Sequence, residues 1–132
     1  MYCFWNSLLR ALRALNLHPD VRTKEDMLKF LKSVNLDTPR VLVNGLQLTE
    51  RQRYENRKHI YNCKIENGYY CSACDPVFVL FAHHFQVNVH HHQRGRVGSF
   101  SVDATHTYTF PGATKTCVFN SSTTHIDFHR IS

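Results

Sequence analysis

The sequence predicts an α+β fold, in which an N-terminal helical lobe with a central helix packs on a C-terminal antiparallel sheet. Apolar residues recur at helical spacing through residues 3–85, and the pattern changes to strand-like alternation from residue 86 onward. The 132 residues suffice for one hydrophobic core but not for two ordinary domains. We therefore expect a single domain over residues 1–132, helical up to about residue 85 and sheet-like over about residues 86–132.

The first part of the chain has the spacing and start signals of helices. Apolar side chains from Cys3 to Leu15 recur at helical spacing with arginines on the other side, so a buried helix begins at or near Cys3. Thr23 and Thr49 are each followed three residues later by a side chain that can complete a capping box. We therefore expect a second helix that ends near Asn35 and a third over residues 50–61.

A fourth helix is expected after Asp75-Pro76, because a helix start stabilises negative charge and tolerates a missing N–H group. It should be buried, since residues 77–85 are mostly apolar.

Residues 40–48 contain Asn44-Gly45, which leaves open a turn-containing connection or a weak hairpin. From Gln86 onward, alternating apolar and polar side chains predict strands. These strands lie around residues 87–89, 97–102, 108–110, 117–119 and 126–131.

The composition is typical of a globular protein with one core. Hydrophobic residues make up 42% and charged residues 20%, which excludes a disordered chain, and the longest apolar stretch is too short to cross a membrane. The five cysteines are odd in number and not densely spaced, so a disulfide framework is not expected. Reduced thiols and an intracellular location follow as expectations.

The formal net charge of +6 favours acidic partners. Nucleic acid is one such partner, but the basic residues are scattered along the chain, so a generally basic, solvated surface is favoured. The rival functional hypothesis is a nonenzymatic module that binds RNA or an acidic protein, with aromatic side chains that stack on bases. The aromatic candidates are Tyr69, Tyr70, Tyr108 and Phe110.

Cys3 is the first candidate for chemistry, because the dipole and free N–H groups of a helix start stabilise a thiolate. The alternative is that Cys3 is a small buried hydrophobe. His125 and Asp127 lie two residues apart on a predicted strand and so share a face, which lets the carboxylate orient the imidazole as a general base. The alternative is a pair of ordinary exposed residues, since the chain contains ten histidines.

Three segments together indicate a family. Tyr2-Cys3-Phe4-Trp5-Asn6-Ser7-Leu8 places aromatic residues after a cysteine at a helix start. Asn67-Gly68-Tyr69-Tyr70-Cys71-Ser72-Ala73-Cys74-Asp75 is a glycine-aromatic turn before an apolar helix and a strand. Phe119-Asn120-Ser121 and His125-Ile126-Asp127-Phe128 form a closing hairpin with a histidine and an acid. The chain thereby resembles the ovarian-tumour (OTU) family of deubiquitinating cysteine proteases, particularly its shortened viral members.

The resemblance implies an OTU-like, papain-type fold whose central helix bears the nucleophile, and an acyl transfer in which His125, assisted by Asp127, deprotonates Cys3. The implied substrate is a peptide or isopeptide bond after the carboxy-terminal tail of ubiquitin or a ubiquitin-like modifier, or a viral polyprotein junction. The side chains expected to bind substrate are Tyr2, Trp5, Tyr70 and Thr124. Trp5 is equally well suited to the core. We expect a monomeric enzyme in the host cytoplasm, without a cofactor and with neither a membrane nor nucleic acid as partner.

The chain departs from the family directly before the nucleophile. Family members usually have Asp-Gly-x there, which helps to build the oxyanion site, whereas only Met1 and Tyr2 precede Cys3. Two explanations are open: either the Cys3 N–H and a neighbouring loop supply the oxyanion donors, or the activity of this trimmed or excised chain is impaired.

Cys71-x-x-Cys74 competes with this interpretation, because together with a further cysteine and a histidine it could bind zinc. A single pair of this kind is a weak zinc signature, so we expect no metal and interpret residues 71–75 as the start of the fourth helix. The zinc candidates are Cys63, Cys71, Cys74 and His83 or His84. The triplet His90-His91-His92 is interpreted as a surface or cleft-rim segment, since its members alternate between faces.

Overall fold

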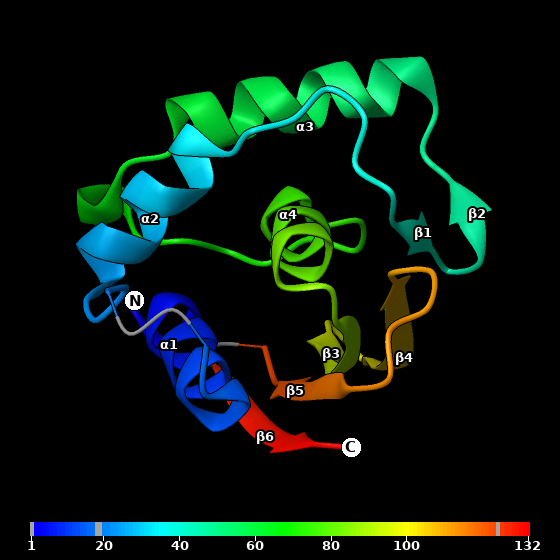
Figure 1. The fold of residues 1–132 in the computed structure, drawn as a ribbon. Coiled ribbons are helices and arrows are strands. Elements are labelled where there is room, and N and C mark those ends of the chain that lie inside the picture. The colour runs from blue at the N-terminus through cyan, green and yellow to red at the C-terminus, as the bar shows by residue number, and fades with distance from the viewer. Residues whose placement is uncertain (1, 18–19, 124) are drawn as a thin grey trace.

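The computed structural model describes residues 2–17, 20–123 and 125–132, and in them the chain forms an α+β fold. Four helices from the N-terminal part pack on a six-stranded sheet that is built mostly by the C-terminal part (Figure 1). The helices are α1 (Cys3–Leu15), α2 (Lys24–Ser33), α3 (Glu50–Asn62) and α4 (Pro76–Phe85), with the 3-10 helix η1 (Ile65–Asn67). The strands are β1 (Leu42–Val43), β2 (Leu46–Gln47), β3 (Asn88–Val97), β4 (Phe100–Thr109), β5 (Thr116–Ser121) and β6 (Ile126–Ile131).

Three of the four helix starts follow the capping signals of the sequence. The side chains of Thr23 and Thr49 each accept the backbone N–H three residues later, at 3.1 Å, and both capping boxes are complete. Asp75 caps α4 directly before Pro76. The start of α1 differs, because no side chain caps it. The four predicted helices are therefore confirmed, with α1 beginning at Cys3 as expected.

Residues 40–48 form a hairpin that belongs to the sheet. β1 and β2 pair around Asn44-Gly45, where φ is 51° for Asn44 and 83° for Gly45, as a tight hairpin turn requires. β1 also pairs with the end of β4, with Val43 opposite Tyr108. Because this hairpin extends the sheet from within the N-terminal part, the predicted division near residue 85 is too simple.

The prediction of an antiparallel sheet is wrong for one pair of strands. The strand order is β2-β1-β4-β3-β5-β6, and β3 runs parallel to β5 whereas the other neighbours are antiparallel. The chain reverses direction twice between β3 and β5, so these two strands point the same way. β1 occupies the edge of β4 at residues 108–109, and β5 lies beside β3 instead. Local alternation predicts strands but does not determine which strands become neighbours.

The core lies between α4, α1 and the sheet. In Figure 1, α4 lies between the sheet and the outer helices α2 and α3, and α1 lies beside β6. Almost every side chain of α4 is buried. Trp5 of α1 is 0% exposed and packs edge-on against Phe4 with ring centroids 5.5 Å apart. Trp5 is therefore a core residue, and the expectation that it binds substrate is corrected.

Asp75 is a buried hub between the helices and the sheet. Its carboxylate accepts hydrogen bonds from the Tyr69 hydroxyl at 2.7 Å and from the N–H groups of Ser72 and Val77 at 2.9 Å each. Its own N–H donates to the Tyr108 hydroxyl of β4 at 2.9 Å. The buried Asp75 thus joins the loop before α4 and the first turn of α4 through its carboxylate, and it contacts a central strand through its backbone N–H.

Replacement of Asp75 should cost much more stability than loss of an ordinary helix cap. In Asp75→Ala, the buried Val77 N–H and the part-buried Tyr69 hydroxyl and Ser72 N–H lose their acceptor, and we expect the free energy of unfolding to fall by about 3 kcal/mol. The matched control is Thr49→Ala, which removes an exposed cap and should cost about 1 kcal/mol. Urea unfolding of both variants measures the difference, and equal losses would contradict the role assigned to Asp75.

Candidate active site

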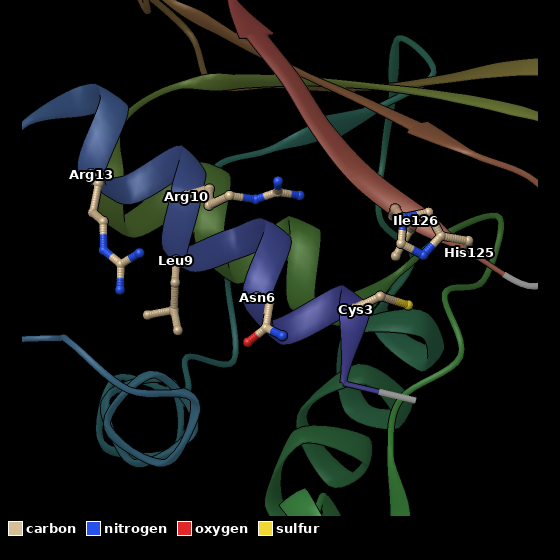
Figure 2. A pocket seen from close by; sticks show the side chains of 7 residues that line it. All are labelled: Cys3, Asn6, Leu9, Arg10, Arg13, His125 and Ile126. Atoms are coloured by element: carbon tan, nitrogen blue, oxygen red, sulfur yellow. The ribbon is translucent and has the colours of Figure 1, made fainter.

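Cys3 and His125 come together where α1 meets β6. Cys3 is the first residue of α1 and is partly exposed, and His125 directly precedes β6 and is exposed. Both line the same two surface hollows, and Figure 2 shows the Cys3 sulfur and the His125 ring beside each other. No hydrogen bond joins the two among the described residues, and catalytic contacts often tighten only when substrate binds. The structure thus brings together the thiol and the imidazole that the sequence paired.

The two hollows differ in their lining. The first, of about 370 Å³, we call the arginine hollow, and it is lined by Cys3, Asn6, Leu9, Arg10, Arg13, His125 and Ile126 (Figure 2). The second, of about 270 Å³, we call the cleft, and it is lined by Cys3, Tyr69, Tyr70, Cys71, Gln93, Ser121, Ser122, Thr123, His125 and Ile126. An extended chain that passes between Cys3 and His125 would therefore occupy both hollows.

The start of α1 suits a negatively charged sulfur. Among the described residues no side chain caps this helix, and its first turn contains no acid. The first backbone hydrogen bond of the helix runs from the Asn6 N–H to the Tyr2 carbonyl at 3.0 Å. The N–H groups before Asn6 lack a partner within the helix, and their partial positive charge stabilises an anion at Cys3.

Asp127 has a different partner from the one predicted. Its carboxylate forms an ion pair with Arg10 of α1, and both side chains are about half exposed. The predicted shared face of His125 and Asp127 required both residues to lie on a strand, but β6 begins only at Ile126. The Ser122 N–H donates to the His125 carbonyl at 2.7 Å, and this hydrogen bond helps to set the position of His125. Asp127 therefore connects β6 to α1, and its orientation of His125 stays a prediction.

The other residues expected to bind substrate differ in where they lie relative to the two hollows. Tyr70 is 84% exposed and lines the cleft, so it can contact a bound chain. Tyr2 is exposed but belongs to neither hollow, and its ring instead lies 4.8 Å from the Lys24 ammonium. Thr124 lies outside the described residues.

A second thiol and imidazole touch each other beside the cleft. The Cys71 sulfur is 3.8 Å from His91 Nδ1, and His91 Nε2 is 2.7 Å from the Ser121 hydroxyl. Burial, reinforced by the negative charge of Asp75, raises the pKa of the Cys71 thiol far above its usual range. Burial, reinforced by His106 and His92, lowers the pKa of His91 to about 4. Both groups are therefore neutral near pH 7, and the pair supports the cleft without supplying a thiolate.

The placement of His91 corrects the interpretation of the histidine triplet. His91 is 1% exposed, so it is not a surface or rim residue. Strand alternation puts it on the same face as Val89, which is fully buried, while His90 and His92 point to the other face. The alternation beginning at Val87 was the signal that could have identified His91 as a buried residue.

Several residues of the two alternative sites, for zinc and for stacking on bases, are buried or have other partners. Among residues 2–17, 20–123 and 125–132, no three His, Cys, Asp or Glu side chains gather to hold a metal ion. The zinc candidate His83 accepts the Arg40 N–H at 2.9 Å, and Cys71 contacts His91. Of the aromatic candidates for stacking on bases, Tyr108 is 0% exposed and Tyr69 is held by Asp75.

The turn that leads to His125 is packed against β3. A Cβ atom on Gly95 would lie 2.6 Å from the Thr123 Oγ1 and 3.3 Å from the Thr123 nitrogen. The same Thr123 hydroxyl accepts the Arg96 N–H at 3.3 Å. Gly95 thus leaves the space that Thr123 occupies, and no sequence pattern indicates the contact because it depends on pairing across the sheet.

Comparison of the chain with protein-family models, with curated proteins and with solved structures found no match. Within the described part of the chain, no helix is long and apolar enough to cross a membrane. The function is therefore inferred from the side chains around Cys3 and from the hollows that they line.

The buried His91 should make stability depend on pH. As the pH falls from about 6.5 to about 4, the unfolded chain takes up a proton that folded His91 does not bind, so stability decreases. The difference between the two pKa values corresponds to about 3 kcal/mol of unfolding free energy. The variant His91→Gln should lose this part of the pH dependence in urea unfolding at pH 7 and pH 4. The exposed control His129→Gln should keep it, and equal pH profiles for wild type and His91→Gln would contradict the prediction.

A methyl group at Gly95 should displace the turn that leads to His125. We expect Gly95→Ala to lower the free energy of unfolding by about 1 to 3 kcal/mol and to shift the NMR signals of the His125 ring, because Thr123 must move. His129, farther along β6, serves as the unshifted reference. In a Thr123→Ala background the same substitution should cost less, since the closest clash is gone. A cost that is the same in both backgrounds would show that the contact is unimportant.

Proposed function

We propose that the protein is a thiol hydrolase in which Cys3 is the nucleophile and His125 the general base. One observation supports this above all: a partly exposed thiol at an uncapped helix start lines the same two hollows as an exposed imidazole. The helix start stabilises the thiolate, and the shared hollows give a substrate carbonyl access to the sulfur. Neither side chain is tied to another residue by a side-chain hydrogen bond among the described contacts.

The reaction would be an acyl transfer from an amide to water. His125 removes the proton of the Cys3 thiol, and the sulfur bonds to the substrate carbonyl carbon. The negative oxygen that forms is stabilised by N–H groups of the first turn of α1. The amine leaves with the proton held by His125, which yields a thioester on Cys3. Water, deprotonated by His125, then releases the carboxylic acid and restores the thiol.

The acyl side of the substrate fits the cleft best. The cleft is lined by two segments, one containing Tyr69 and Tyr70 and the other residues 121–123, and by Gln93 of β3. Apart from His125 its lining has no basic or acidic side chain. An extended tail with small side chains suits such a cleft. This agrees with what the ovarian-tumour resemblance implies, namely a tail ending in glycines, as in ubiquitin or a ubiquitin-like modifier.

We further propose, on the same resemblance, that the enzyme is an OTU-like deubiquitinase of viral type that acts in the host cytoplasm, with a polyprotein junction as a second class of substrate. The rival pair, Cys71 and His91, is less suited to catalysis because His91 is buried and both groups are neutral near pH 7. The nonenzymatic hypothesis, a basic module that binds RNA or an acidic protein, is the one that remains if Cys3 does not react.

A ubiquitin-derived electrophilic probe should label Cys3 covalently. We expect Cys3→Ala to abolish labelling, His125→Ala to slow it at least about a hundredfold, and Cys71→Ala to retain it, because only Cys3 has a general base in an open site. Intact-protein mass spectrometry followed by peptide mapping identifies the labelled sulfur. Circular dichroism of each variant controls for folding. Labelling that persists in folded Cys3→Ala, or its absence in folded wild type, would refute the proposed mechanism.

A further inference from the structure

The exposed side of α1 forms one continuous stripe that begins at the proposed nucleophile. The stripe consists of Cys3, Asn6, Arg10 and Arg13. Successive members are three, four and three residues apart, which places them on one face of the helix. Asn6, Arg10 and Arg13 are exposed and Cys3 is partly exposed, while the remainder of α1, apart from Ala14, is buried. The stripe lies along the arginine hollow, as Figure 2 shows.

The length of the stripe matches a short stretch of extended chain. At about 1.5 Å of rise per helical residue, Arg10 lies about 10 Å and Arg13 about 15 Å along the helix axis from Cys3. Extended backbone advances about 3.3 Å per residue, so about three to five substrate residues would reach from the scissile bond to these arginines.

The arginine hollow is lined by basic side chains, one of which already pairs with a carboxylate. Its lining contains two arginines and no acid. Arg10 forms an ion pair with Asp127, which does not belong to the lining. Arg13 donates to the Arg22 carbonyl at 3.3 Å, which leaves its charge without an acid among the ion pairs of the described residues. The nearby start of α2 adds no free acid, because Asp26 accepts backbone N–H groups and Glu25 pairs with Lys24.

The two hollows at Cys3 therefore differ in charge and in lining. The cleft lacks charged residues other than His125, whereas the arginine hollow is lined mainly by α1, together with His125 and Ile126, and contains two arginines. If the acyl tail takes the cleft, the chain that bears the leaving amine must run along α1. A segment with longer side chains fits there, and carboxylates on it would meet Arg10 and Arg13.

We infer that the arginine hollow is a subsite for an acidic segment on the amine side of the scissile bond. Arg13 is the main specificity-determining residue, since Arg10 is shared with Asp127. Asn6 supplies an amide near the first residues of this segment. This inference rests on the proposed function and goes beyond it, because it assigns the chemistry of the acceptor chain from which the modifier is removed.

The test uses three substrates that share the same ubiquitin moiety. In two of them ubiquitin is joined by an isopeptide bond to a lysine in a short peptide, flanked on both sides by glutamates in one and by lysines in the other. The third is a ubiquitin aminocoumarin amide, which places no peptide in the arginine hollow. For each enzyme variant, kcat/KM on the two peptide substrates is divided by its own kcat/KM on the aminocoumarin amide.

Wild type should prefer the acidic over the basic substrate by about fivefold, and added salt should reduce this ratio. Arg13→Glu should invert the preference. Lys58→Glu, the same charge change on an exposed residue of α3, should leave the ratio unchanged. Equal cleavage of both peptides by wild type, or the same response to Arg13→Glu and Lys58→Glu, would overturn the subsite while leaving hydrolysis intact. If wild type cleaves none of the three substrates, both the proposed hydrolase function and the proposed subsite are refuted.

Discussion

The buried carboxylate of Asp75 is the interaction on which the arrangement of this site depends. Taking a carboxyl group out of water is costly unless hydrogen bonds replace the lost hydration, and here a hydroxyl and two backbone N–H groups do so. The hydroxyl belongs to Tyr69, whose ring stacks on Phe4 with centroids 4.3 Å apart. Phe4 is the neighbour of Cys3 in α1. The capping of α4 and the placement of the proposed nucleophile are thus connected through one tyrosine.

The other half of the site depends on contacts of the last hairpin. The ion pair between Arg10 and Asp127 joins α1 to β6, and the close approach of Thr123 to Gly95 seats the turn on β3. His125 stands between these two contacts and has no tether of its own among the described side-chain hydrogen bonds. An imidazole that must accept and release protons benefits when its side chain has no fixed hydrogen-bond partner, provided that neighbouring contacts hold the backbone in place. The arginine hollow and the cleft both border Cys3 and His125.

Sequence patterns predicted the helices well because their signals are local. A capping residue and its partner lie three positions apart, and an apolar stripe is visible within a few turns. The predictions were less complete where a residue's partner lies far along the chain. Asp127 forms an ion pair with Arg10 of α1, and its assignment to His125 stays a prediction. The interpretation of the histidine triplet as a surface or cleft-rim segment is wrong for His91, which is buried and contacts Cys71 and Ser121. The sequence left open whether Trp5 belongs to the core or binds substrate, and its packing against Phe4 places it in the core.

By itself, the sequence determined that the chain contains four helices and a later set of strands, that a cysteine begins the first helix, and that a histidine and an acid lie two residues apart near the last strand. These properties depend on side-chain periodicity and on caps within a few residues. The tertiary structure alone decided that β3 and β5 run parallel, that Asp127 pairs with α1, and that Cys3 and His125 line common hollows. Such pairings join residues separated by many positions, and their free energy comes from burial and hydrogen bonds that exist only once the chain has folded.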